Sequence, residues 1–140
     1  MLKVMFLCTG NSCRSQMAEG LARDLGKGLI DAWSAGLMAA GVNSRAVRVM
    51  QELGIDISEQ RSKTIDERQL RSMDVVITLC AHAEGSCPRT PAGIKRFHWP
   101  INDPVGAIGT DEEIMAEFRR ARDEIRGQVI GFIRDLQKDR

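Results

Sequence analysis

The sequence lacks a long apolar run, a net charge of one sign and a recognisable secretion signal. None of its 140 residues lies in a stretch close to the roughly 20 apolar residues that a membrane-spanning helix needs. Lys and Arg number 20 against 19 for Asp and Glu, and this balance argues against a nucleic acid or a membrane surface as partner. The N-terminal apolar run is short and leads into a loop motif where a cleavage site would stand. We therefore expect a cytoplasmic protein.

The sequence also lacks the closely spaced cysteine pairs that are typical of zinc sites. Its four cysteines are Cys8, Cys13, Cys80 and Cys87, and no two of them have C-x2-C spacing. We therefore expect no metal bound by these thiols. Without a secretion signal, a permanent disulfide framework is not expected either. Redox or nucleophilic use of the thiols is the better interpretation.

The most informative motif is C-T-G-N-S-C-R-S, from Cys8 to Ser15, between an apolar run and an amphipathic segment. The backbone N–H groups of such a loop converge on one point, and the N-terminus of the next helix adds partial positive charge there. Arg14 can bind two oxyanion oxygens at once, and the same donors would stabilise a nucleophilic Cys8 thiolate. The alternative is a buried structural cysteine. The expected oxyanion-binding loop comprises Thr9, Gly10, Asn11, Ser12, Cys13, Arg14 and Ser15.

The chain alternates between strand and helix patterns, which predicts one α/β domain over residues 1–140. Its sheet would have four parallel strands with helices on both faces. The predicted strands are 2–7, 29–34, 75–79 and 94–98. The predicted helices are 14–25, one from Asn43 or Ser44 that ends before Gly54, 64–73, and a long one that Thr110 and Glu113 open with a capping box.

Three reactive side chains follow strand ends. Cys8 follows the first strand, Cys80 the third, and Asp103 lies a few residues beyond the fourth. Because ligands of parallel sheets bind at the carboxyl ends of the strands, we expect these residues to meet at one rim. Pro104 restrains the backbone of Asp103, which could act there as a general acid. A simple Asx turn is the alternative for this aspartate.

Cys80 and Cys87 bracket a short segment that we expect to be flexible. If residues 81–86 were helical, the two Cα atoms would lie about 10 Å apart, at a rise of about 1.5 Å per residue. A disulfide needs roughly 4.4–6.8 Å, so pairing would require the segment to unwind or loop. We interpret the pair as redox-active. Cys13 is interpreted as loop filling, because Cys8 already holds the nucleophile position.

Over essentially its whole length the chain resembles the thioredoxin-coupled arsenate reductases, which share the fold of low-molecular-weight protein tyrosine phosphatases. The first of the matching segments and the Cys80/Cys87 pair are the specific features. The matching segments are Cys8 to Gly20, Trp33-Ser34-Ala35-Gly36, Thr78-Leu79-Cys80, Ser86-Cys87-Pro88, His98-Trp99, Asp103-Pro104 and Arg122-Asp123-Glu124-Ile125.

The resemblance implies a relay of three thiols that needs no cofactor. Cys8 would attack arsenate, held by the loop and Arg14, while Asp103 protonates the departing oxygen. Cys80 would then attack Cys8 and release arsenite through a transient Cys8–Cys80 disulfide. Cys87 would attack Cys80 and move the disulfide outward, where thioredoxin would reduce it.

One position departs from the family. Some relatives bind potassium beside the loop, at positions that match Asn11, Glu19 and Ser34, and with a carboxylate at the place of Lys63. We expect that the Lys63 ammonium takes the place of the cation and pairs with Glu19; a solvated Lys63 is the alternative.

Two other functions compete with this interpretation. A tyrosine phosphatase would use the same loop and the Asp-Pro pair, but such enzymes typically surround their substrate with aromatic side chains, and this chain has no tyrosine. A non-catalytic anion or redox sensor would show no turnover with a reductant. Residual phosphatase activity and a monomeric state are our further expectations.

Overall fold

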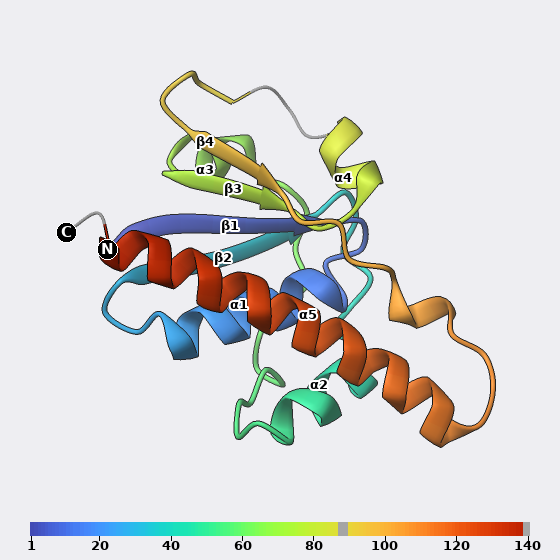
Figure 1. The fold of residues 1–140 in the computed structure, drawn as a ribbon. Helices are drawn as coiled ribbons and strands as arrows, with labels where there is room; N and C mark the ends of the chain where they lie inside the picture. The colour runs from blue at the N-terminus through green and yellow to red at the C-terminus, as the bar shows by residue number, and fades with distance from the viewer. Residues whose placement is uncertain (87–89, 139–140) are drawn as a thin grey trace.

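The computed structural model describes residues 1–86 and 90–138 and forms one sheet with helices on both faces (Figure 1). The sheet order is β2-β1-β3-β4, and all neighbours are parallel. The strands are β1 (Leu2–Cys8), β2 (Ile30–Gly36), β3 (Val75–Thr78) and β4 (Lys95–His98). The helices are α1 (Arg14–Leu25), α2 (Ser44–Gln51), α3 (Glu67–Arg71), α4 (Ala81–Ser86), the 3₁₀ turn η1 (Pro104–Gly106) and α5 (Asp111–Lys138). The α/β fold class with four parallel strands is confirmed.

The two central strands carry the core. Val4 to Leu7 of β1 are fully buried, as expected of a strand covered on both faces, and β3 is buried along its whole length. Helices α1 and α5 pack together on one face, and α3 and α4 lie on the other (Figure 1). This division follows from right-handed crossovers between parallel strands. Both reactive strand ends, at Cys8 and Thr78, therefore point to the same rim.

Helix ends follow the predicted capping chemistry. The Asn43 side chain accepts hydrogen bonds from the N–H groups of Arg45 and Ala46 and so begins α2. Thr110 and Glu113 form the predicted capping box at the start of α5, with both hydrogen bonds at 3.2 Å.

The sequence predictions were wrong at several element boundaries. Of the predicted helix 64–73, only Glu67–Arg71 is helical, because the Asp66 side chain caps the helix there and Thr64 instead bridges to Gly36. The second strand extends to Gly36 rather than ending at 34, and β3 ends at Thr78 rather than at 79. The segment expected to be flexible after Cys80 is helix α4.

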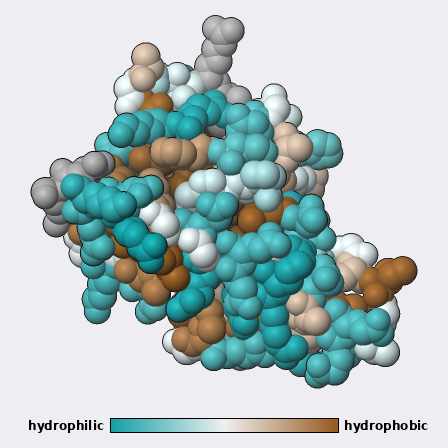
Figure 2. All heavy atoms as spheres, in the orientation of Figure 1, coloured by the Kyte–Doolittle hydropathy of each residue, from teal (hydrophilic) through white to brown (hydrophobic). Residues whose placement is uncertain are grey.

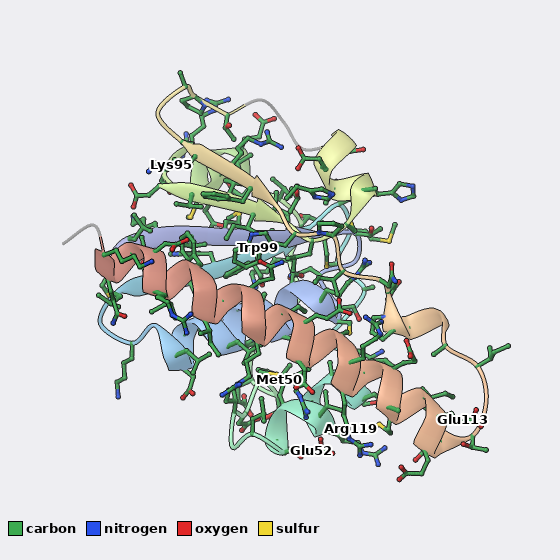
Figure 3. All side chains as sticks on the ribbon, viewed as in Figure 1. Met50, Glu52, Lys95, Trp99, Glu113 and Arg119 are labelled. Atoms are coloured by element: carbon green, nitrogen blue, oxygen red, sulfur yellow. The ribbon has the colours of Figure 1, made fainter. Side chains whose placement is uncertain are left out.

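Helix α5 packs against the rest of the domain through an aromatic cluster and through ion pairs with Glu52. The Trp99 ring lies 6.1 Å from that of Phe6 and 6.0 Å from that of Phe132 on α5. At the other end of the helix, Arg119 donates three hydrogen bonds of 3.0 to 3.1 Å to the carboxylate of Glu52 (Figure 3). Trp99 also begins the segment that leads from β4 to Asp103, so its packing fixes the direction of that segment.

The face of the molecule drawn in Figure 2 is predominantly polar. On the face drawn in Figure 2, hydrophobic side chains are scattered between hydrophilic ones. Within residues 1–86 and 90–138, no helix combines the length and apolar character that a membrane crossing requires.

Gly36 marks the closest approach of β2 to the loop after β1. A Cβ atom at this position would lie 2.6 Å from the backbone nitrogen of Asn11 and 2.9 Å from the carbonyl oxygen of Thr9. Neither backbone atom can move without moving the loop itself. Glycine is therefore required here by close approach rather than by an unusual backbone conformation.

We predict that Gly36→Ala lowers the free energy of unfolding by about 1–3 kcal/mol, because the added methyl group overpacks a backbone contact. Urea unfolding measures the change. Gly127→Ala is the control: its Cβ would meet nothing within 4 Å on α5, so it should gain about 0.5–1 kcal/mol. Equal stability of Gly36→Ala and the wild type would contradict the close-approach explanation.

Candidate active site

The predicted nucleophile lies at the junction of β1 and α1. Cys8 is the last residue of β1 and is almost fully buried, with 3% of its surface exposed. Its Sγ lies 2.8 Å from the Oγ of Ser15, in the first turn of α1. The loop between them folds back so that its start and its end meet at the sulfur.

Asn11 is the residue that turns this loop. It has a left-handed backbone with φ of 45°, which asparagine tolerates better than most residues, and it is fully buried. Its side-chain amide donates to Ser15 Oγ at 2.8 Å and to Ser34 Oγ at 3.0 Å. Since Ser15 Oγ accepts from Asn11, its own proton is available to the Cys8 sulfur. Ser15 can therefore donate a hydrogen bond to this sulfur.

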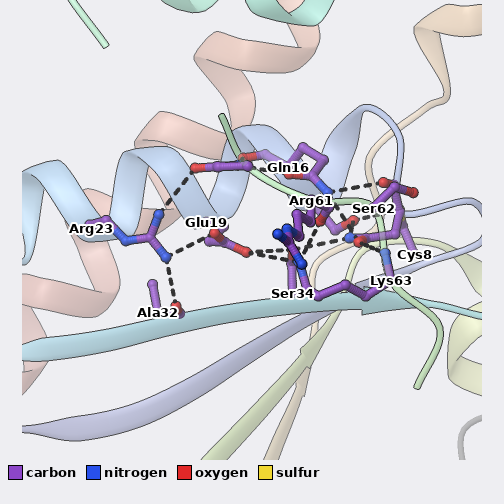
Figure 4. A network of polar contacts seen from close by, with 12 residues as sticks. Cys8, Gln16, Glu19, Arg23, Ala32, Ser34, Arg61, Ser62 and Lys63 are labelled. Atoms are coloured by element: carbon purple, nitrogen blue, oxygen red, sulfur yellow. Dashed lines mark hydrogen bonds and ion pairs between the residues drawn. The ribbon is translucent and has the colours of Figure 1, made fainter. Parts of the chain in front are cut away.

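The hydrogen-bond chain continues away from the sulfur to charged groups (Figure 4). Ser34 Oγ accepts from Asn11 and donates to the buried carboxylate of Glu19 at 2.6 Å. Arg23 binds the other oxygen of Glu19 at 2.8 Å. The Nζ of Lys63 lies 3.8 Å from Glu19 and donates to the carbonyl of Arg61.

The surroundings of Lys63 act on its charge in opposing directions. Partial burial lowers the pKa of Lys63, and the charge of Arg23 acts in the same direction. The charge of Glu19 opposes both effects, because it favours the ammonium form. Asn11, Glu19, Ser34 and Lys63 therefore form one connected polar group beside the loop.

Arg14 connects the loop to the predicted general acid. Its guanidinium donates to the carbonyl of Ile101 at 2.9 Å and lies 3.6 Å from the carboxylate of Asp103. The Arg120 guanidinium donates to the Asn102 carbonyl at 3.2 Å from the opposite side. The segment that carries Asp103 is thus held by two arginines through its backbone.

Both interpretations of Asp103 have a structural counterpart. One carboxylate oxygen accepts from the N–H of Val105 at 3.0 Å, which is the Asx-turn geometry at the start of η1. The other oxygen faces Arg14. The turn thus fixes the carboxylate through one oxygen and leaves the other directed toward Arg14.

Cys80 lies against the same loop. It is 8% exposed, and its Sγ is 3.2 Å from the hydroxyl of Thr9, the residue next to Cys8. The N–H of Ala83 in α4 also points at this sulfur, at 3.4 Å. The structure therefore brings Cys8, Arg14, Cys80 and Asp103 to one rim, whereas Cys87 lies outside the described residues.

Cys13 has a different character from the other thiols. Cys8, Cys13 and Cys80 are all free, but Cys13 packs in the core with 3% exposure. Burial raises the pKa of the Cys13 thiol, and the negative charges of Asp103 and Cys8 raise it further, whereas Arg14 lowers it. A thiol held in its neutral form is a poor nucleophile, which agrees with its interpretation as loop filling.

Sequence reasoning missed one group that supports the loop. Gln16 donates through Nε2 to the Asn11 carbonyl, to its side-chain oxygen at 3.0 Å, and to the Arg61 carbonyl at 2.9 Å. The signal is the full burial of its polar side chain on α1, which only the structure reveals. Gln16 thereby joins the loop to the segment that bears Lys63.

Residues 3–140 match the low molecular weight phosphotyrosine protein phosphatase family. The chain belongs to this family. A relative from Halalkalibacterium halodurans, named arsenate reductase, is 54% identical over 92% of this chain and 93% of its own length. Among solved structures of this phosphatase fold, an arsenate reductase in its phosphate-binding state is 38% identical, with a TM-score of 0.78 over 96% of this chain and 98% of the other. A low molecular weight phosphatase from T. tengcongensis is 30% identical, with a TM-score of 0.80 over 96% of this chain and 99% of the other.

The raised pKa of Cys13 predicts a stability loss at alkaline pH. The folded protein keeps this thiol protonated where the unfolded chain, with a thiol pKa of about 8.5, loses its proton. This contribution to stability is complete below that pKa and is lost as pH rises. Between about pH 8 and about pH 9.5, the free energy of unfolding should fall by about 1 kcal/mol more in the wild type than in Cys13→Ala.

Urea unfolding in the presence of a reductant measures this difference. The two proteins should change in parallel below about pH 7.5, where neither state of the wild type loses the thiol proton. Parallel curves over the whole alkaline range would show that Cys13 titrates alike in the folded and unfolded chains.

Proposed function

We propose that this protein reduces arsenate to arsenite through Cys8, Cys80 and Cys87 and is then re-reduced by thioredoxin. The contact between Cys80 and Thr9 carries the proposal, because it places a second buried thiol directly on the oxyanion loop. Phosphate-ester hydrolysis needs only one thiol. Reduction of As(V) to As(III) takes two electrons, which two thiols supply when they join as a disulfide. The relative that is 54% identical is named arsenate reductase, which supports the same activity.

The first step is nucleophilic substitution at arsenic. The Cys8 thiolate, stabilised by Ser15, attacks arsenate bound by the loop amides and by the Arg14 guanidinium. An S–As bond forms and one As–O bond breaks. Asp103 gives a proton to the departing oxygen, which leaves as water. The short distance between Arg14 and Asp103 lets one side chain bind the anion while the other protonates it.

The second step is the reduction. The Cys80 thiolate attacks the sulfur of Cys8, an S–S bond forms and the S–As bond breaks. The electron pair of that bond remains on arsenic, which leaves as arsenite. Cys80 is suited to this attack because its sulfur borders Thr9 and so lies beside the nucleophile's own loop.

The third step carries the disulfide away from the buried site. The Cys87 thiolate attacks the Cys80 sulfur, and Cys8 leaves as a thiolate ready for another cycle. If the helix of α4 extended from residue 80 to residue 87, the two Cα atoms would lie about 10 Å apart, so we expect α4 to unwind before this disulfide forms. A dithiol such as that of thioredoxin then reduces the Cys80–Cys87 bond by exchange, becoming a disulfide itself.

A tyrosine phosphatase is the second candidate, and family membership favours it as an alternative. It would use Cys8, Arg14 and Asp103 as above but would leave Cys80 without a role. Beyond Asp103 and Pro104 stand Val105 and Gly106 rather than aromatic side chains that could hold a phosphotyrosine ring. Phosphate and arsenate are nearly isosteric, so weak aryl phosphatase activity is compatible with the reductase. A redox sensor would bind the anion without turnover.

We predict steady oxidation of NADPH when arsenate is added to the protein with thioredoxin and thioredoxin reductase. Cys80→Ser and Cys87→Ser should abolish turnover, but Cys87→Ser should still release about one equivalent of arsenite and retain a Cys8–Cys80 disulfide. Full multiple turnover by Cys87→Ser with thioredoxin as sole reductant would contradict the relay. Rapid hydrolysis of an aryl phosphate without arsenate reduction would identify a phosphatase instead.

We further propose that Lys63 supplies a positive charge beside Glu19 on the side of the carboxylate that Arg23 does not bind. Replacement of sodium by potassium at fixed ionic strength should therefore change wild-type activity by less than about twofold. In Lys63→Asp, Glu19 gains a carboxylate neighbour in place of the ammonium, and a hard monovalent cation would offset the repulsion. Its activity should fall in sodium and recover several-fold in potassium. A several-fold potassium response of the wild type would overturn this role of Lys63.

A further inference from the structure

A second polar cluster lies where α4, the helix that follows Cys80, packs against β3 and β4. We call it the Glu84 cluster; it comprises Thr78 on β3, Glu84 on α4, and Arg96 and His98 on β4. Thr78 is fully buried, and its hydroxyl donates a hydrogen bond to the carboxylate of Glu84. The same carboxylate lies 3.8 Å from the Arg96 guanidinium and 3.8 Å from His98 Nδ1.

The hydrogen bonds of the cluster have a fixed direction. Thr78 has one hydroxyl proton, and the carboxylate of Glu84 can only accept. His98 Nδ1 lies 2.9 Å from Thr78 Oγ1, so it must be the donor in that pair. Imidazole, hydroxyl and carboxylate thus form a chain from β4 through β3 to α4. Each member is positioned by the next, and Glu84 is the member that belongs to the helix.

Helix α4 has little else to hold it in shape. It is six residues long, which is too short for a helix to be stable by itself, and it contains Gly85. Of its side chains, only that of Ala83 is buried in the core. The Glu84 cluster is therefore the main polar attachment that the described residues give to this helix.

Glu84 also lies within the segment that has to change shape. It follows Cys80 by four residues and precedes Cys87 by three. A fully helical segment from residue 80 to residue 87 would hold the two Cα atoms about 10 Å apart, which is too far for a disulfide. We therefore expect closure of this disulfide to unwind α4 and to separate Glu84 from at least some of its partners on β3 and β4. The cluster stabilises the dithiol form and is lost, in part or in full, in the disulfide form.

We propose that Glu84 is a positioning residue that holds Cys80 against the oxyanion loop and sets the equilibrium between the Cys80/Cys87 dithiol and its disulfide. This inference rests on the proposed relay, for which it assigns the element that opposes the third step. While Glu84 keeps its contacts with β3 and β4, Cys80 stays beside Thr9, where its sulfur can attack the sulfur of Cys8. Release of Glu84 lets the segment unwind toward Cys87.

The test is a redox titration of the full-length chain carrying Cys8→Ser, which leaves Cys80 and Cys87 as the exchanging pair. Mixtures of reduced and oxidised glutathione poise the pair: each disulfide formed converts one oxidised glutathione to two reduced molecules. Alkylation and mass measurement of the 80–87 peptide give the fraction oxidised. In Glu84→Ala the equilibrium constant for disulfide formation should rise about tenfold, or about 30 mV for this two-electron couple.

Two further variants separate charge from structure. Glu84→Gln keeps an acceptor for Thr78 but loses the charge that faces Arg96 and His98, so its shift should be smaller, about threefold. Glu67→Ala removes a glutamate of α3 that pairs with Arg71 at 3.2 Å on an exposed surface, and it should not shift the equilibrium.

Amide hydrogen exchange of the reduced proteins provides the second readout. In Glu84→Ala, residues 81–86 should exchange about tenfold faster while β1 exchanges at the wild-type rate. An unchanged redox equilibrium in Glu84→Ala, with a Cys80–Cys87 disulfide forming normally in the parent, would overturn the role of Glu84. Failure of the parent to form that disulfide in any glutathione mixture would overturn the relay itself, and the inference with it.

Discussion

The two amide hydrogens of Asn11 are the constraint on which the candidate site depends. One goes to Ser15 and the other to Ser34, and no side-chain hydroxyl could supply both. Through Ser15 they direct a hydroxyl proton toward the Cys8 sulfur, and through Ser34 they reach the buried charge of Glu19. The left-handed backbone of Asn11 makes this reach possible. The turn of the loop and the hydrogen bond available to the Cys8 sulfur thus both depend on Asn11.

The same network explains why distant segments must be folded before the site exists. Ser34 comes from β2, and Gln16 connects Asn11 to the backbone of Arg61. Gly36 lets the backbone of β2 approach the loop closely, and the Lys63 N–H donates to the Asn11 side chain at 2.7 Å. The loop is therefore supported by tertiary contacts on every side, which suits a site that has to bind a small, highly charged anion without rearrangement.

The features that the sequence predicted correctly are those determined by short segments of the chain and by the order of its strands and helices. The apolar run of β1, the capping residues Asn43 and Thr110, and the rim shared by Cys8, Cys80 and Asp103 follow from periodicity, capping and parallel topology. Contacts between residues far apart in the sequence could not be predicted from the sequence alone. The Glu84 cluster joins residues 78, 84, 96 and 98, and nothing in a single sequence marks their adjacency. The helical state of α4 was missed for the same reason, because its stability comes from β3 and β4 rather than from its own residues.

The marginal character of α4 is itself required by a relay. A thiol beside the oxyanion must be buried to meet an intermediate shielded from water, whereas a disulfide that another protein reduces must be accessible. Cys80 cannot satisfy both conditions in one conformation. A long, well-packed helix after Cys80 would fix it in the buried state, and an unstructured segment would leave it outside. In the proposed relay, a six-residue helix held by the contacts of one carboxylate would have folded and unwound states close enough in free energy for a single S–S bond to choose between them.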